Sequence, residues 1–154
     1  MDYQVCRTEQ TDLEELSILF DEYLQFYSKT LAMPDIQGFL TARLTKQDSV
    51  IFVAKDTQGS VIGFLQLYPS FSSLDLAPIF ILNDVYVTQH ARCVGVGRKL
   101  MEAAIEHGRR GQVAYLCLET QHDNLRAQGL YQALGFNKDT EFATYTLDIQ
   151  RSLK

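Results

Sequence analysis

The residues whose types and spacing best suggest chemistry lie where an apolar run meets a glycine-bearing turn. Val85-Tyr86-Val87 ends the run, and Arg92-Cys93-Val94-Gly95-Val96-Gly97-Arg98 follows, at the expected start of a helix. The first amides of a helix have no internal partners and carry partial positive charge. Glycines let a backbone approach a ligand closely. The turn therefore predicts a phosphate site, to which Arg92 and Arg98 add positive charge.

Two known phosphate-binding motifs do not match this turn. The pattern of two glycines followed by Lys and Ser or Thr is absent. A dinucleotide fingerprint needs a third glycine where Leu100 stands, and no acidic ribose partner is in register. A nucleotide-binding module and a tight turn without a ligand both stay open as alternatives.

The elements before the turn follow from apolar periodicity. Thr11-Asp12-Leu13-Glu14 resembles a capping box that opens a helix, and Pro34-Asp35 starts a second one. Residues 69–78 are expected to form a loop. The expected strands of this half are 3–7, 49–55, 61–68 and 79–87, with a hairpin turn at Asp56-Thr57-Gln58-Gly59.

The elements after the turn alternate. We expect a helix over 96–107, a strand over 113–119, a helix capped by Asp123 or Asn124, and one or two strands within 136–149. A strand–helix–strand unit requires a right-handed crossover and a parallel strand pair. The predicted fold class is α+β, or loosely α/β, with one mixed sheet covered by helices.

Two segments carry a resemblance to a known family. Arg92-x-x-Gly95-x-Gly97, after the strand-like 82–87, resembles the Arg/Gln-x-x-Gly-x-Gly/Ala signature of the Gcn5-related N-acetyltransferase (GNAT) superfamily. Residues 124–136 resemble its second hallmark, Asn-x-x-Ala-x-x-Leu-Tyr-x-x-x-Gly-Phe. The two motifs stand in the family's order, about 30 residues apart. Residues 67–73 also resemble a subgroup with fungal histone and D-amino-acid acetyltransferases.

The resemblance implies residues 1–154 as a single N-acetyltransferase domain, with a mostly antiparallel twisted sheet of about six or seven strands and about four helices. It implies acetyl-CoA as cosubstrate, with the pyrophosphate on the amides of 92–97 and the pantetheine beside 85–87. Cys93 and Val94 depart from the family's usual residues. The implied cofactor-binding residues are Val85, Tyr86, Val87, Arg92, Cys93, Val94, Gly95, Val96, Gly97, Arg98, Asn124 and Tyr131.

Acetyl transfer to an amine requires a proton acceptor, an oxyanion donor and an acid for the leaving thiolate. Tyr131 is the candidate acid, by resemblance, and its alternative is a core tyrosine. A strand amide near Val85 is the candidate oxyanion donor if a bulge opens the strand there. Several relatives carry Glu where Asn83 stands, so the base is expected elsewhere, at Asp84 or Glu119. Both carboxylates also have a purely structural interpretation.

The acceptor amine is expected beside an aromatic helix face. Tyr23, Phe26 and Tyr27 accompany Glu22, a third candidate carboxylate, and aromatic rings beside carboxylates suit a cationic amine. The candidate substrate-binding residues are Glu22, Tyr23, Tyr27 and Asn83. The ordinary alternative is a packed amphipathic helix.

The composition limits which kinds of partner and which compartment we expect. The formal net charge is −5, which disfavours nucleic acid and acidic membranes as partners. Cys6, Cys93 and Cys117 form no paired motif and the three histidines are isolated, so we expect no disulfide framework and no metal. The start lacks a signal-peptide pattern, which predicts a cytoplasmic protein. Relatives commonly pair, so a homodimer stays open.

The sequence thus predicts an acetyl-CoA-dependent N-acetyltransferase that acts on a small amine, an amino acid or a lysine side chain by direct attack. A non-catalytic acyl-CoA-binding or regulatory domain on the same fold remains the main alternative, because a fold does not fix a function.

Overall fold

The structure, a computed structural model, describes the backbone of residues 1–152. The chain divides into two compact units, Met1–Glu119 and a second that begins at Thr120. All strands of the described residues lie in the first unit. The expectation of a single domain over 1–154 stays a prediction.

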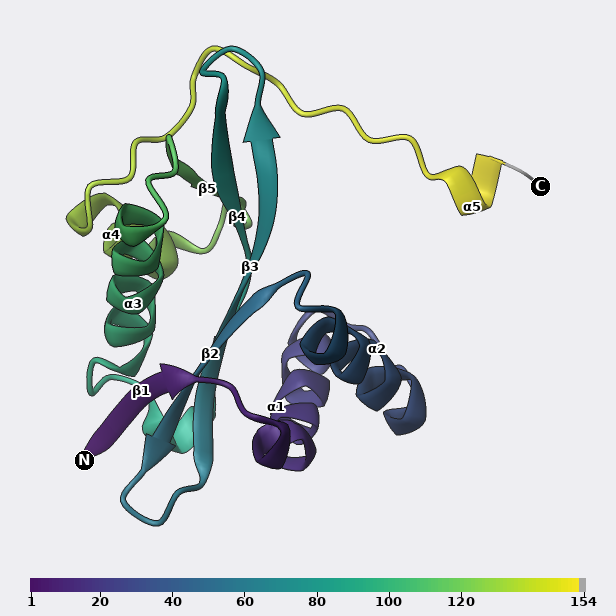
Figure 1. The fold of residues 1–154 in the computed structure, drawn as a ribbon, viewed down its shortest axis with the longest axis vertical. Helices are drawn as coiled ribbons and strands as arrows, with labels where there is room; N and C mark the ends of the chain where they lie inside the picture. Colours follow the sequence, from purple (N-terminus) through teal and green to yellow (C-terminus); the bar gives the residue numbers. More distant parts are fainter. Residues whose placement is uncertain (153–154) are drawn as a thin grey trace. The chain divides into compact units, whose positions relative to one another are not determined.

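The first unit contains one five-stranded sheet in the order β1-β2-β3-β4-β5 (Figure 1). All neighbouring strands are antiparallel except β4 and β5, which are parallel. The predicted parallel pair around a helical crossover is therefore present. The strands are β1 (Tyr3–Arg7), β2 (Val50–Asp56), β3 (Val61–Ser72), β4 (Ala77–Val87) and β5 (Leu116–Leu118).

The hairpin between β2 and β3 closes where the sequence predicts it. The Asp56 carboxylate accepts hydrogen bonds from the Gln58 and Ser60 amides, each at 2.9 Å. Gly59 has φ +82°, a left-handed conformation that glycine adopts without a steric penalty.

The expected loop over residues 69–78 is wrong. β3 and β4 continue through this segment as a paired hairpin, from Pro69 opposite Phe80 to Ser72 opposite Ala77. Only residues 73–76 form the turn, in which the Ser72 hydroxyl donates to Asp75 at 2.8 Å. Pro69 and Pro78 suggested a loop, but proline is tolerated where a strand has a free edge.

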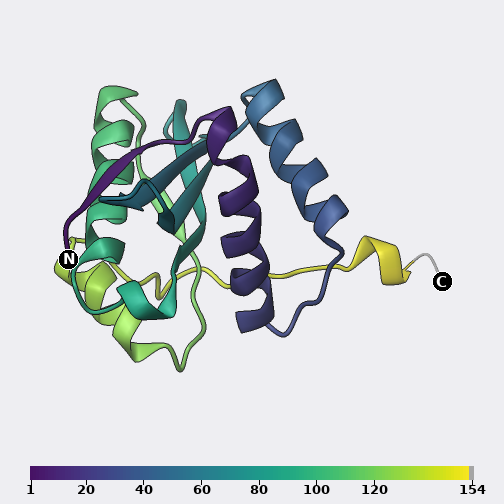
Figure 2. The same ribbon diagram turned by 90° about the horizontal axis from the view of Figure 1, so that it is seen from below.

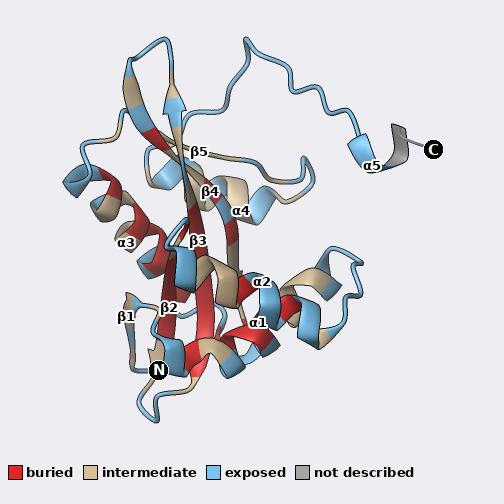
Figure 3. Ribbon diagram, turned by 45° about the vertical axis from the view of Figure 1, so that its right-hand side comes forward, coloured by how far each residue is buried: buried red, intermediate tan, exposed pale blue. Residues whose placement is uncertain are grey.

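Two helices cover one face of the sheet. α1 (Leu13–Phe26) and α2 (Met33–Lys46) lie on the side opposite α3 (Val96–Arg110) in Figure 2. Buried residues concentrate in the central strands and on the sheet-facing sides of the helices (Figure 3). The core on the α1 side comprises Leu16, Leu19, Phe20, Ile36, Leu40, Ile51, Val53, Val61 and Phe64.

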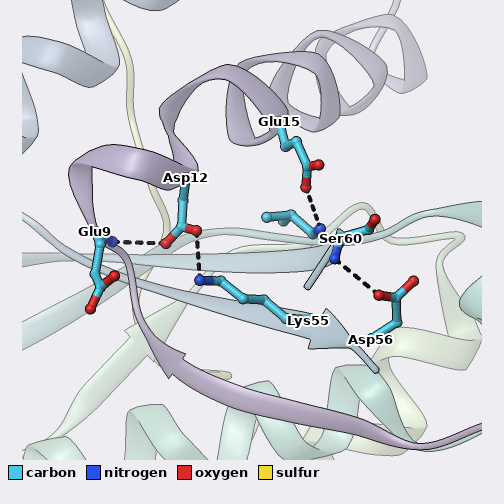
Figure 4. A network of polar contacts seen from close by, with 7 residues as sticks. Glu9, Asp12, Glu15, Lys55, Asp56 and Ser60 are labelled. Carbon is cyan, nitrogen blue, oxygen red and sulfur yellow. Dashed lines mark hydrogen bonds and ion pairs between the residues drawn. The ribbon is translucent and has the colours of Figure 1, made fainter. Parts of the chain in front are cut away.

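The start of α1 differs from the predicted capping box. A 3₁₀ turn (Gln10–Asp12) precedes the helix, and the Asp12 carboxylate accepts from the Glu9 amide at 2.8 Å. Asp12 also pairs with Lys55 Nζ at 2.6 Å, and Glu15 accepts from the Val61 amide at 2.7 Å (Figure 4). Asp12 thus caps the start of the 3₁₀ turn, and together with Glu15 it also fixes this helical segment to the β2–β3 hairpin.

α3 packs closely on the sheet at Gly63. A Cβ on Gly63 would lie 3.1 Å from the Tyr86 carbonyl oxygen, 3.2 Å from Leu100 and 3.3 Å from Val96. The absence of a side chain at this position therefore allows the start of α3 to pack on β3 and β4.

The second unit contains α4 (Leu125–Ala133) and the short α5 (Ile149–Ser152). Asn124 caps α4, because its side-chain oxygen accepts from the Ala127 amide at 3.3 Å. Residues 136–148 form no strand in the described structure, so the predicted tail strands are wrong there. A β-rich composition cannot form a strand without a pairing partner.

The fold class is confirmed as α+β with a mixed sheet, and the strand count is lower than predicted. The described residues form five strands instead of six or seven, since the tail contributes none. The strand predicted over 113–119 is shortened to Leu116–Leu118.

Candidate functional site

A bulge in the middle of β4 determines which side chains face α1. Gln66 pairs with Asp84, whereas the next β3 residue, Leu67, pairs with Leu82, which leaves Asn83 as the extra residue. One inserted residue moves all later side chains to the opposite face of a strand. Asp84 and Tyr86 therefore lie on the α1 side, and Asn83 is exposed.

β4 loses its partner on one side just after this bulge. β5 pairs with β4 only from Phe80 to Leu82. Among the described residues, the stretch from Asn83 to Val87 pairs with β3 and with no strand on its other edge. The free edge presents backbone groups that an extended ligand can use like an added strand.

The turn after β4 leads directly into α3 through left-handed residues. Cys93 has φ +66° and Gly95, which precedes the first residue of α3, has φ +89°. The Lys99 amide is bonded to the Gly95 carbonyl at 3.0 Å, so the amides of Val96, Gly97 and Arg98 precede the helical ladder. These amides are among those that the sequence predicts to bind an anion, and that role stays a prediction.

The two arginines of the turn have different surroundings. Arg92 Nε donates to the Val87 carbonyl at 2.8 Å, and its guanidinium lies 5.5 Å from the Tyr86 ring centroid. Arg92 thus fixes the turn to the end of β4. Arg98 pairs with Glu102 one turn along α3 at 3.3 Å, so its charge is partly compensated.

Asp84 lies inside the α1-facing side of the sheet with only 5% of its surface exposed. Its carboxylate accepts from Gln66 Nε2 at 2.8 Å and from Asn83 Nδ2 at 3.1 Å. Burial raises the pKa of Tyr23, and the charge and hydrogen bonding of Asp84 raise it further. Burial and the same charge raise the pKa of Tyr68 to about 12.

Glu22 joins α1 to the end of β4. Its Oε2 accepts from the Tyr86 hydroxyl and from the Thr88 hydroxyl, both at 3.1 Å. Because Tyr86 also lies under Arg92, the same ring contacts the turn and the acidic side chain. The predicted acceptor residue Glu22 is therefore connected to the predicted cofactor turn.

An aromatic cluster extends from this site along α1. The Tyr23 ring lies 5.7 Å from Phe64, 6.2 Å from Tyr86 and 5.2 Å from Tyr27, in edge-to-face arrangements. Tyr27 is 39% exposed, so the cluster reaches the surface. The structure therefore brings Glu22, Tyr23 and Tyr27 together with Asp84 in one region.

Three predicted residues are not part of this cluster. Glu119 is exposed after the end of β5. Asn124 and Tyr131 belong to the second unit, where the Tyr131 and Phe136 ring centroids lie 6.1 Å apart in a tilted arrangement. The roles of these residues stay predictions.

Sequence reasoning missed Gln66, Tyr68 and Thr88. Gln66 is 1% exposed, and its Oε1 has no hydrogen-bond partner among the described residues. A single amide within the apolar run 61–67 is the signal that could have identified it, since a buried polar group needs partners.

No group of three His, Cys, Asp or Glu side chains is placed to hold a metal ion within the described chain. Among the helices of residues 1–152, none has the length and apolar character to cross a bilayer.

The parallel β4–β5 pair that separates after three residues, together with the glycine turn into α3, defines an acyltransferase-type fold and site. Comparisons with known proteins agree. The family model for the acetyltransferase (GNAT) family matches residues 13–136, and the chain belongs to this family. The protein is thus an acetyltransferase.

Two curated relatives and one solved structure illustrate the similarity. The chain is 38% identical to the uncharacterized N-acetyltransferase YhfO of Bacillus subtilis over 94% of this chain and 97% of that protein. It is 32% identical to the D-amino-acid N-acetyltransferase HPA3 of Saccharomyces cerevisiae, over 85% and 83%. The crystal structure of a probable acetyltransferase matches with a TM-score of 0.89 and 37% identity, over 95% and 97%.

Proposed function

We propose that this acetyltransferase transfers the acetyl group of acetyl-CoA to a primary amine by direct attack in a ternary complex. The observation that carries the proposal is the pair of free backbone surfaces: the amides of Val96, Gly97 and Arg98, and the open edge of β4 from Asn83 to Val87. A diphosphate suits the first and an extended pantetheine arm suits the second.

The cofactor would extend from the turn along the open edge of β4. The pyrophosphate would lie on the amides of 92–97, with Arg92 and Arg98 nearby. The pantetheine would run beside Val85, Tyr86 and Val87. By resemblance to the family, Asn124 and Tyr131 are also proposed cofactor contacts.

The attacking amine must be neutral, because a protonated amine has no free electron pair. Only on the order of one alkylamine in a thousand is neutral at pH 7, so the reaction needs a proton acceptor. Asp84 is the preferred proton acceptor over Glu119, since it adjoins Tyr23 and the aromatic cluster, whereas Glu119 is exposed. The bulge at Asn83 supports a free strand amide near Val85 as oxyanion donor. Tyr131 remains the proposed acid for the leaving thiolate.

The acceptor would approach over α1. Glu22 and Asp84 supply negative charge, and Tyr23 and Tyr27 supply aromatic faces that favour an ammonium group. Exposed Asn83 would contact the acceptor near the reacting carbonyl. The relative HPA3 is named for D-amino acids, which supports an amino acid beside a small amine or a peptide lysine as acceptor classes.

A non-catalytic acyl-CoA-binding domain is the second candidate. It is favoured by Asn83, whose amide donates to Asp84 and cannot accept a proton as a carboxylate does. The two candidates share the cofactor site and differ only in turnover.

The test is thiol release from acetyl-CoA with polyamines, amino acids and basic peptides. The proposal expects release with at least one amine class and none without protein. Binding of CoA without release for every amine would favour the second candidate, and absence of CoA binding in calorimetry would contradict both.

We also propose a cytoplasmic protein that forms a homodimer, as its sequence pattern and its family resemblance suggest. Sedimentation of the purified chain at a mass near 17.5 kDa would contradict the dimer.

A further inference from the structure

The buried carboxylate of Asp84 cannot meet an acceptor amine directly. With 5% of its surface exposed, it is enclosed by the amides of Gln66 and Asn83 and by the phenols of Tyr23 and Tyr68. A proton that reaches Asp84 must therefore pass through a group that contacts both the carboxylate and the acceptor region.

Tyr23 is placed between these two regions. Its ring packs edge-on against Phe64 and Tyr86, which pair across β3 and β4. The next pair on the same face is Gln66 and Asp84, and, in addition to the effect of burial, the Asp84 carboxylate lies close enough to the Tyr23 hydroxyl to raise its pKa. On its other side Tyr23 contacts the partly exposed Tyr27.

We propose that Tyr23 is a catalytic residue that relays a proton from the acceptor ammonium to Asp84. An N–H bond of the ammonium breaks as its proton moves to the Tyr23 hydroxyl oxygen, and the proton of that hydroxyl moves to a carboxylate oxygen of Asp84. The neutral amine then attacks the acetyl carbonyl. After product release the Asp84 proton returns to the Tyr23 oxygen as the proton of the Tyr23 hydroxyl moves to water. This relay rests on the proposed function.

The neighbouring charges suit a phenol that stays protonated at rest. Burial of Tyr23 and the adjacent Asp84 raise its pKa, so the hydroxyl keeps its proton and donates to the carboxylate. A concerted relay needs no free phenolate. The titratable and charged groups that face this region are Glu22, Tyr27, Arg43, Asp48, Tyr68 and Tyr86.

Gln66 acts as a positioning residue in this relay. Its amide nitrogen donates to Asp84 at 2.8 Å from the opposite strand, which fixes one carboxylate oxygen and leaves the other toward Asn83. Gln66 thereby holds the Asp84 carboxylate in a fixed position for the relay.

The test is Tyr23→Phe, which keeps the ring packing and removes only the hydroxyl. With an amine that the wild-type protein acetylates, we expect the turnover number to fall about 100-fold, within the range of general acid–base effects. The KM for acetyl-CoA should stay within about twofold. Tyr115→Phe, an exposed tyrosine outside the site, is the matched control and should keep full turnover.

A double-variant cycle separates a relay from a structural role. If Tyr23 and Asp84 act in one chain, Tyr23→Phe with Asp84→Asn should turn over no more slowly than the slower single variant. Melting temperatures identify variants that fail to fold. Gln66→Leu should lower the turnover number while the KM for acetyl-CoA stays within about twofold, a split that a purely structural residue would not give.

Two outcomes overturn the relay. Tyr23→Phe turnover within twofold of wild type contradicts it while leaving the proposed function intact, as do losses that multiply in the double variant. If the wild-type protein releases no thiol with any amine, the proposed function fails and the relay fails with it.

Discussion

The turn after β4 and the Asp84 face of β4 are built in opposite ways. The turn offers backbone amides from consecutive residues, set by left-handed Cys93 and Gly95. The Asp84 face offers side chains from α1, β3 and β4, which meet only because the sheet and helix pack. Charge is provided by the peptide groups in the first region and by a buried carboxylate in the second.

This difference explains how one strand, β4, would serve both proposed ligands, the cofactor and the acceptor. The turn needs only local geometry, so changes there should affect cofactor binding with little effect on stability. The Asp84 face needs tertiary packing, so changes there should affect the acceptor and the rate. Tyr86 contacts both regions and is the place where the separation can be tested.

The largest effect is expected for Gly97→Glu. A Cβ at Gly97 has room, with Val87 as its nearest neighbour at 3.8 Å, so the added carboxylate would face the proposed diphosphate without steric strain. We expect calorimetry to show about 100-fold weaker CoA binding, or about 2.7 kcal/mol.

Gly97→Ala is the control and should bind CoA within threefold of wild type. Equal CoA affinity for Gly97→Glu and the wild-type protein would remove the diphosphate from the turn.

Tyr131→Phe tests the acid role that the family resemblance implies for this residue. Loss of the proposed acid should lower turnover about 30-fold, or about 2 kcal/mol of transition-state stabilisation, with CoA affinity nearly unchanged. Steady-state thiol release measures the first quantity and calorimetry the second. Unchanged turnover would exclude Tyr131 from the acid role.

Gly63→Ala tests the packing on which both regions depend. The new Cβ would press on the Tyr86 carbonyl and on two α3 side chains at 3.1–3.3 Å. We expect a destabilisation of about 1 kcal/mol, seen as a melting temperature lower by about 3 °C.

Gly38→Ala in α2 is the matched control for Gly63. A Cβ there meets nothing within 4 Å, and a helix interior favours alanine, so we expect a stabilisation of about 0.5 kcal/mol. Equal melting behaviour of the two variants would contradict the tight contact at Gly63.

The smallest effect is expected for Tyr86→Phe. The variant loses the 3.1 Å hydrogen bond to Glu22 but keeps the ring under Arg92, and Thr88 still donates to Glu22. The KM of the amine should rise about threefold, or about 0.6 kcal/mol, with CoA affinity unchanged. A larger change in CoA affinity than in amine KM would show that the two regions are not separable.

Much of the fold was predictable because its signals are local. Apolar alternation and helical spacing placed α1–α4 and β1–β4 within a few residues, and the glycine turn fell at the start of α3 as expected. The errors arose where strand formation depends on pairing with a distant segment. The hairpin beyond Pro69 forms because β3 and β4 pair with each other there. The tail has no pairing partner and forms no strand in the described residues.

The candidate site was only partly predictable for the same reason. The sequence supplied the turn, Glu22, Tyr23 and Asp84 as candidates but gave no reason to choose between Asp84 and Glu119. The sequence did not indicate Gln66, because its hydrogen-bond partner, Asp84, lies 18 residues further along the chain, on the neighbouring strand.

The sequence by itself determined the acetyltransferase family and the glycine turn proposed to bind an anion, since both depend on residue types at fixed short spacings. Only the tertiary structure decided that Asp84 faces α1 beneath Tyr23. That outcome depends on a one-residue bulge at Asn83, and the register of two strands is set by the packing of both of their faces, which no single segment encodes.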